Sequence, residues 1–181
     1  MKYKVLCLAS IALLLFVGFR VVKQVLRVHD MLSTKSTIGR GKVDNTIKPF
    51  LNKFIHEYEN RGHSLDPSNI SISIIPYSVE LFGDTNVAGV CYFDHPFMGP
   101  EPTIVLQKEM WAKIGFSMKE VIIYHELGHC LLNRDHCEYV DPTRTGYASI
   151  MGPNAAHIVD NFVNNRKEML DELFSPREEC Q

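Results

Sequence analysis

The sequence predicts an α+β fold in which a small mixed sheet packs on an N-terminal helix and a central helix, with a further helix near the C-terminus. Apolar residues recur at helical spacing from Ile47 to Tyr58, and a capping pattern opens a second helix through residues 121–124. Residues 70–74 alternate isoleucine with serine, as a strand does. Hydrophobic residues make up 45% of the 181 residues, which is typical of a globular domain. A net charge of −2 gives no indication of nucleic-acid binding.

A membrane segment is predicted for residues 1–26. Lys2 and Lys4 precede an uncharged apolar run at 5–19, and Arg20 can snorkel to the lipid interface and so lengthen the apolar stretch. No small-x-small cleavage site follows, which favours an uncleaved signal-anchor over a cleaved signal peptide. We therefore expect a membrane-anchored protein whose folded domain is exported to the periplasmic or extracellular side. Secretion after signal cleavage is the alternative.

A tether is predicted between this segment and the folded domain. Residues 27–43 are rich in Ser, Thr, Lys and Gly and show no periodicity, which indicates a flexible linker. The folded domain is expected to span residues 44–181, with Asp44 capping its first helix and Gly62 near that helix's end.

Three strands and a last helix complete the predicted domain. The first strand includes residues 70–74 and closes at Pro76, the second covers 87–93, and the third covers 103–107. The second and third are expected to form a hairpin-like unit. Asn154 can cap the last helix.

The sequence His125-Glu126-Leu127-Gly128-His129 has the spacing of a zinc hydrolase helix. Residues four apart lie on one helical face with Cβ atoms about 5–6 Å apart, so two imidazoles can converge on one ion at about 2.0–2.1 Å each. Glu126 lies about 100° around the helix from His125. That position suits a carboxylate that takes a proton from water beside the ion better than it suits a third ligand.

A third ligand requires the chain to reverse after this helix. If the helix continued, His136 would lie about 10.5 Å beyond His129, too far to share a metal. Asn133 tolerates the left-handed conformation that ends helices, so we expect the helix to stop there. The prediction is a site in which His125, His129 and His136 hold one Zn²⁺ with a fourth position open. Asp135 is the competing oxygen ligand.

Two neighbouring patterns strengthen this interpretation. Residues 117–120 (Ser-Met-Lys-Glu) have the form of a capping box, which predicts that a strong helix carries the motif. Downstream, residues 149–153 (Ser-Ile-Met-Gly-Pro) form an apolar turn centred on Met151.

The motif and the methionine turn together resemble the metzincin metalloproteases, whose pattern is H-E-x-x-H-x-x-G-x-x-H followed by a Met-turn. The residues that match directly are His125, Glu126, His129 and Met151. Leu132 stands where the family has glycine, and the last histidine comes one residue late. One extra helical residue, with Asn133 doing the glycine's work, would reconcile the two patterns. This combination of residues resembles a group of small exported bacterial metalloproteases.

The resemblance implies a zinc-dependent endopeptidase that acts on a peptide or protein substrate with Glu126 as general base. Met151 would form an apolar floor beneath the ion. The strand before the motif helix would be an edge strand on which bound peptide pairs by strand addition, with an ordinary sheet edge as the alternative. Its residues are Thr103, Ile104, Val105, Leu106 and Gln107. Tyr147 is a candidate for stabilising an oxyanion, and plain packing is its alternative role.

Two other functions stay open. A gluzincin-type hydrolase would take a downstream glutamate, Glu168 or Glu172, as its third ligand. A non-catalytic, membrane-tethered zinc-binding or interaction module would hold a structural zinc whose fourth position is closed, by Cys137 or His157.

The cysteines indicate disulfides if the domain is exported to an oxidising compartment. The four in the predicted domain are Cys91, Cys130, Cys137 and Cys180, and four cysteines allow three pairings that the sequence does not distinguish. A bridge between Cys91 and Cys130 would brace the motif helix. A thiolate ligand at Cys130 or Cys137 is the alternative, but beside a ligating histidine it would point away from the ion.

Overall fold

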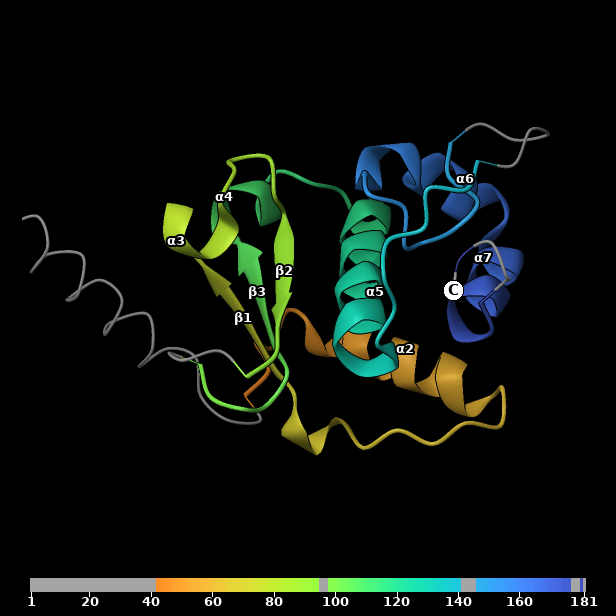
Figure 1. Cartoon of the computed structure of the whole chain (residues 1–181), viewed down its shortest axis with the longest axis horizontal. Helices are drawn as coiled ribbons and strands as arrows, with labels where there is room; N and C mark the ends of the chain where they lie inside the picture. The colour runs from red at the N-terminus through yellow and green to blue at the C-terminus, as the bar shows by residue number, and fades with distance from the viewer. Residues whose placement is uncertain (1–41, 95–97, 141–145, 177–179, 181) are drawn as a thin grey trace, which may run out of the picture. The chain divides into compact units, whose positions relative to one another are not determined.

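The computed structural model describes residues 42–94, 98–140, 146–176 and 180 (Figure 1). The predicted membrane segment, and all of the predicted tether except Lys42 and Val43, lie outside these residues. Within the part of the chain that is described, no helix is long and apolar enough to cross a membrane.

A three-stranded mixed sheet forms one side of the domain (Figure 1). β1 (Ser71–Ile75) pairs parallel with β3 (Thr103–Gln107), and β3 pairs antiparallel with β2 (Gly89–Tyr92), which gives the order β1-β3-β2. Val43 adds a parallel bridge to Ile72. The α+β class, the small mixed sheet and the antiparallel pairing of the second and third strands are confirmed.

The position of β3 overturns one expectation. β3 is the central strand, not an edge strand, and all five of its residues are buried. Strand addition needs unpaired backbone groups, and those of β3 face β1 on one side and β2 on the other. The expectation that it receives a peptide is therefore wrong for Thr103, Ile104, Val105, Leu106 and Gln107.

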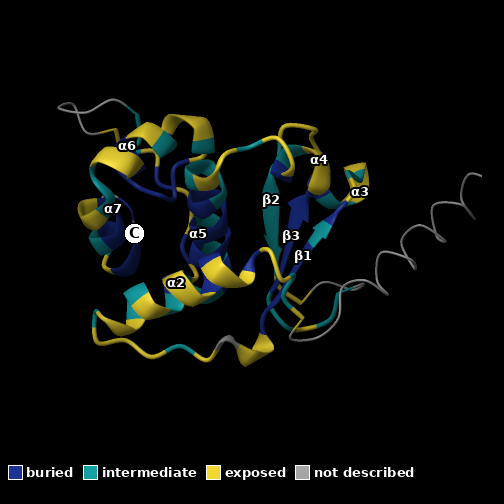
Figure 2. Ribbon diagram, turned by 180° about the vertical axis from the view of Figure 1, so that it is seen from behind, coloured by how far each residue is buried: buried dark blue, intermediate teal, exposed yellow. Residues whose placement is uncertain are grey.

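The helices lie mainly on the other side of the domain, around α5 (Phe116–Leu132) (Figure 1). α5 packs against β2 and β3, and α2 (Lys48–Glu59) and α6 (Val159–Asn164) pack against α5. α7 (Arg166–Phe174) follows α6. The short helical elements are η1 (Pro67–Asn69), α3 (Val79–Phe82), α4 (Lys108–Trp111) and η2 (Ala155–His157). Figure 2 shows α5 largely buried between the sheet and the other helices.

The core divides at the sheet because successive strand residues point to opposite faces. On β3, Ile104 and Leu106 belong to the main cluster, which extends through α2, α5 and α7. Val105 belongs to a smaller cluster with Ile75 and with Phe82 of α3. The sheet therefore has helix α5 on one face and a thinner cover on the other.

The beginning of α5 differs from the prediction. The N-cap is Gly115, no side chain caps the helix, and the helix already includes Phe116. Ser117 therefore lies inside the first turn, and the capping box is wrong. The helix forms without it because its residues pack on the sheet: Val121, Ile123 and Leu127 have no exposed surface.

Two disulfides connect the elements. Cys91 on β2 is bonded to Cys130 on α5, and Cys137 is bonded to Cys180 near the C-terminal end. One of the three possible pairings is thus selected, and it contains the predicted brace between β2 and the motif helix. Neither Cys130 nor Cys137 is available as a thiolate ligand in this state.

Peptide mapping of the unreduced protein should recover two linked pairs, Cys91 with Cys130 and Cys137 with Cys180. Replacing Cys91 and Cys130 together by alanine should lower the free energy of unfolding by about 4 kcal/mol, because a crosslink across 39 residues is removed from the unfolded chain. Mass spectrometry and urea denaturation measure the two results. Recovery of either alternative pairing would contradict the structure.

Candidate metal centre

The chain reverses at the end of α5 as predicted. Asn133 adopts the left-handed conformation, with φ 51° and ψ 42°, and its backbone N–H donates to the carbonyl of Gly128. The N–H of Arg134 donates to the same carbonyl at 3.1 Å. This tight end to the helix brings His136 back beside the two helical histidines.

The three imidazoles meet at their Nε2 atoms. The Nε2 of His125 lies 3.1 Å from that of His129 and 3.2 Å from that of His136. His125 and His129 are partly buried, and His136 is exposed, so the cluster opens toward solvent on the side of His136. Asp135, the competing ligand, is exposed and is not a member of the cluster.

Two backbone carbonyls fix the direction of the helical histidines. The Nδ1 of His125 lies 2.8 Å from the carbonyl oxygen of Ile150, and the Nδ1 of His129 lies 2.6 Å from that of Arg134. A carbonyl only accepts hydrogen bonds, so each Nδ1 carries the proton and donates. Each Nε2 then carries a lone pair that is directed into the cluster.

This donor set fits a tetrahedral metal ion. With metal–nitrogen distances of about 2.0–2.1 Å, tetrahedral geometry sets ligand nitrogens about 3.3 Å apart, close to the observed spacing. Protonating an imidazole here is unfavourable: burial, aided by the neighbouring His129 and His136, lowers the pKa of His125 to about 4. Burial, with His136 adding to it, also lowers the pKa of His129. Neutral imidazoles are the form that binds zinc.

Glu126 faces the sheet beside this cluster. Its side chain is buried and accepts a hydrogen bond from the backbone N–H of Cys91 on β2. Gly89 makes room for it, because a Cβ there would lie 3.0 Å from Oε1 of Glu126. Burial raises the pKa of Glu126 to about 8, only partly opposed by the hydrogen bond from Cys91.

Met151 packs against the motif helix from the other side. It has no exposed surface, and a Cβ on Gly128 would clash with its Sδ, so the glycine of the motif is what allows the methionine to approach. The carbonyl of Met151 accepts the N–H of Cys137 at 2.9 Å. The turn therefore supports both the helix and the segment that carries His136.

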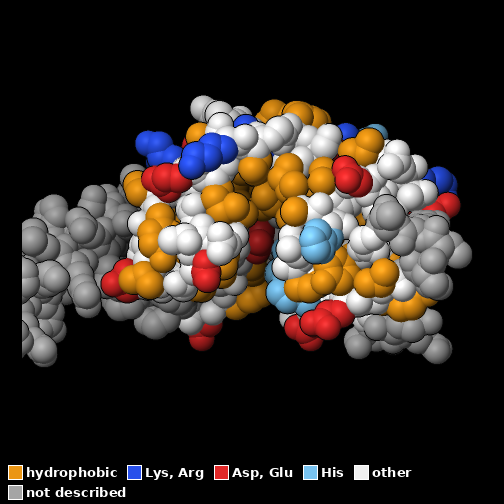
Figure 3. All heavy atoms as spheres, turned by 90° about the horizontal axis from the view of Figure 1, so that it is seen from above, with side chains coloured by type: hydrophobic (Ala, Val, Ile, Leu, Met, Phe, Trp, Pro, Cys, Tyr) orange, Lys and Arg blue, Asp and Glu red, His pale blue; other side chains and the backbone are white. Residues whose placement is uncertain are grey.

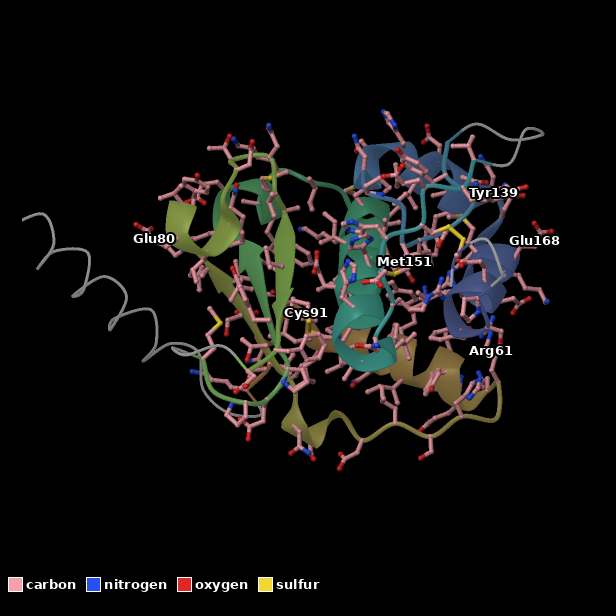
Figure 4. All side chains as sticks on the ribbon, in the orientation of Figure 1. Arg61, Glu80, Cys91, Tyr139, Met151 and Glu168 are labelled. Carbon is pink, nitrogen blue, oxygen red and sulfur yellow. A yellow bond between two sulfur atoms is a disulfide. The ribbon has the colours of Figure 1, made fainter. Side chains whose placement is uncertain are left out.

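A groove runs between the sheet side and the helical side of the molecule. Figure 3 shows this hollow with an acidic side chain deep inside it and histidine side chains along one wall. Figure 4 shows Cys91 on the sheet side of α5 and Met151 on the opposite side. Histidine and acidic side chains therefore border the hollow that Figure 3 shows.

The remaining candidates lie elsewhere. The ring of Tyr147 packs over Gly152 and stacks beside His157 with centroids 6.2 Å apart, and no described contact joins either ring to the three histidines. Glu168 is exposed and points outward from α7 (Figure 4). Glu172 is buried and paired with Arg134.

Sequence reasoning missed the residues that orient the ligands. Arg134 and Ile150 act through backbone carbonyls, which any residue type supplies, so no sequence signal marks them. Glu172 was considered only as a ligand. Its partners are Arg134, 38 residues earlier, and Ser149, 23 residues earlier, and local patterns do not reveal such pairs.

Comparisons with models of protein families, with curated proteins and with solved structures gave no match for this chain. The function is therefore argued from the geometry of the site.

In the metal-free protein, the free energy of unfolding should fall relative to that of Glu126→Gln as the pH rises from 4.5 to about 8. The raised pKa means that the folded protein holds this proton more tightly than the unfolded chain. The stability it contributes is complete below the unfolded pKa and lost as the pH rises through the folded pKa. The difference at pH 8 should be roughly 2–4 kcal/mol. Urea titrations in chelator across this pH range measure it, and parallel curves would contradict the burial of the carboxyl group.

Proposed function

We propose that this chain is a zinc-dependent endopeptidase of the metzincin type. His125, His129 and His136 hold the ion and Glu126 is the general base. The observation that carries the proposal is the meeting of three Nε2 atoms, with that of His125 3.1 Å from that of His129 and 3.2 Å from that of His136, next in sequence to the buried carboxylic acid of Glu126. Structural zinc sites rarely keep a position open, whereas catalytic sites combine three protein ligands with one open position.

The chain's own residues divide the chemistry between them. Zinc, when bound, polarises a carbonyl oxygen and lowers the pKa of water at the open position. Glu126 takes the proton from the attacking water and delivers it to the leaving amine. The carboxylate needed for this step is favoured by a nearby divalent cation, which offsets the burial that raises its pKa. Met151 keeps the side of the helix behind the ligands apolar and dry.

A peptide substrate is supported by the edge of β2. Gln107 donates to the carbonyl of Ala88, so alternate residues of β2 face β3, and the backbones of Gly89 and Cys91 face the opposite way, toward α5. The N–H of Cys91 on that side already binds Glu126. An extended peptide beside this edge would therefore pass the general base, but it would not pair with the N–H of Cys91, which Glu126 occupies.

The alternatives receive less support. A gluzincin site needs a free glutamate, but both carboxylate oxygens of Glu172 are bonded to Arg134 and Ser149, and Glu168 points outward. A closed structural zinc would need a fourth ligand, yet Cys137 is in a disulfide and His157 lies beside Tyr147. The two disulfides also favour an exported location for the domain.

Glu126→Ala in the full-length chain should bind one equivalent of zinc and lose peptidase turnover by at least about 1000-fold, because the proton acceptor is gone while the ligands remain. Zinc analysis and digestion of a peptide library measure the two properties. Glu59→Ala, at an exposed position on α2, is the control and should keep both. Wild-type activity in Glu126→Ala would refute the general-base role.

His136→Ala and Asp135→Ala form a matched pair, since both residues are exposed neighbours on the same segment. Removing the histidine should weaken zinc binding by at least about 100-fold, whereas removing the aspartate should change it by less than about threefold. Competition with a chromophoric chelator gives both dissociation constants. The opposite order would assign the third ligand to Asp135, and no effect from either would favour a ligand set of another kind.

A further inference from the structure

A buried network connects α7 to the two segments that orient the histidines. Oε1 of Glu172 lies 2.7 Å from a guanidinium nitrogen of Arg134, and Oε2 accepts the hydroxyl of Ser149 at 2.5 Å. The other guanidinium nitrogen donates to the carbonyls of Glu172 and Leu173 at 3.0 and 2.7 Å, at the end of α7. The exposed fractions of Arg134, Ser149 and Glu172 are only 8%, 0% and 4%.

Each arm of this network reaches a histidine within one or two residues. Arg134 itself supplies the carbonyl that accepts the Nδ1–H of His129. Ser149 precedes Ile150, whose carbonyl accepts the Nδ1–H of His125. The hydroxyl of Ser149 also accepts the N–H of Met151 at 3.0 Å.

The third histidine is connected through the same turn. The carbonyl of Met151 accepts the N–H of Cys137, the residue that follows His136. The two segments that orient His125 and His129 through backbone carbonyls, one of which also carries His136, are therefore held by a single carboxylate on a helix that contributes no ligand.

We propose that Glu172 is a positioning residue for the metal centre, which fixes the ring orientation of His125 and His129 by holding Ser149 and Arg134. The inference rests on the proposed function only in that the three histidines are taken as the ligands of one ion. Groups that orient metal ligands through hydrogen bonds commonly change metal affinity by about 10–100-fold when they are removed.

The physical reason lies in the irregular backbone of these segments. Residues 133–140 and 146–152 lie in no helix or named strand, so few ladder hydrogen bonds hold the two carbonyls in place. A buried ion pair adds little net stability, because the loss of hydration offsets the attraction between the charges. What it does provide is a fixed geometry, since both oxygens and both guanidinium nitrogens are used at once.

A second buried carboxylate supplies a matched control. Glu120 on α5 is also 4% exposed and is paired with Arg166 at 2.7 Å and Lys53 at 2.8 Å. Its two partners belong to α7 and α2 and make no described contact with the segments that orient the histidines. Replacement of Glu120 therefore breaks a comparable ion pair and leaves the network of Glu172, Arg134 and Ser149 intact.

The test uses the full-length chain, stripped of metal and reloaded with zinc or cobalt(II). Glu172→Gln should weaken zinc binding by roughly 10–100-fold and alter the visible spectrum of the cobalt(II) form, which reports ligand geometry. Glu120→Gln should keep the wild-type affinity and spectrum despite a similar loss of stability. Ser149→Ala removes one arm alone and should give a smaller loss. The double variant Ser149→Ala/Glu172→Gln should lose less than the product of the two single effects.

The metal-free protein gives an independent measurement. In proton NMR the Nδ1–H signals of His125 and His129 should exchange slowly with water in the wild type and in Glu120→Gln, and faster in Glu172→Gln. This NMR measurement still tests the role of Glu172 if the wild type binds no zinc. Failure of the wild type to bind zinc would refute the proposed function. Zinc binding without peptidase activity would refute the proposed activity and leave the role of Glu172 intact.

Three results would overturn the inference. One is a folded Glu172→Gln with wild-type zinc affinity, cobalt spectrum and ring N–H exchange. The second is an equal change in Glu120→Gln, which would indicate general destabilisation. The third applies if Glu172→Gln fails to fold. Ser149→Ala is then the deciding variant, and wild-type zinc affinity and cobalt spectrum in Ser149→Ala would overturn the inference.

Discussion

Three imidazole rings that meet at their Nε2 atoms are the constraint on which the rest of this structure depends. The Nε2 of His125 lies 3.1 Å from that of His129 and 3.2 Å from that of His136. The Nδ1 atoms of His125 and His129 carry the protons, so these two rings direct their Nε2 lone pairs at each other, which is unfavourable without a cation between them. The chain holds them there all the same, by a left-handed asparagine, two carbonyl acceptors and a methionine packed against a glycine. Arrangements that are locally unfavourable persist only where the surrounding structure fixes them from several sides, and such arrangements cluster at functional sites.

The contacts that hold the three histidines in place are distributed unevenly. His125 and His129 belong to α5, which the sheet and the helices hold on several sides. His136 belongs to a segment without regular secondary structure, and there the anchors are concentrated: the Cys137–Cys180 disulfide, the Cys137 to Met151 hydrogen bond and the Arg134–Glu172 pair. A covalent link and a buried charge pair substitute for the ladder hydrogen bonds that a helix or strand would supply. Precision at the third ligand thus comes from connections to α7 and the C-terminal end.

The sequence could predict what depends on local spacing. The interval of four between His125 and His129, the tolerance of Asn133 for positive φ and the strand at residues 70–74 are all predictions from neighbouring residues. The structure has the two histidines together, Asn133 in the left-handed conformation, and β1. The features that the sequence could not predict depend on contacts between residues far apart in the chain. The parallel pairing of β1 with β3 makes residues 103–107 central, the disulfide pairing selects one of three options, and the network of Glu172 spans 23 and 38 residues. The capping box failed for another reason: tertiary packing set the start of α5, and Gly115 took the cap position.

On the sheet side of the site, Cys91 makes two of the contacts that hold the site together. Its sulfur is bonded to Cys130, next to His129, and its N–H is bonded to Glu126, so one residue sets both the spacing of β2 from α5 and the direction of the carboxyl group. Burial raises the pKa of that group to about 8, against the opposing effect of the hydrogen bond from Cys91. A divalent ion among the histidines would remove the repulsion of the lone pairs and also favour the ionised form of Glu126. One positive charge at this position would therefore act on both the histidines and the carboxyl group of Glu126.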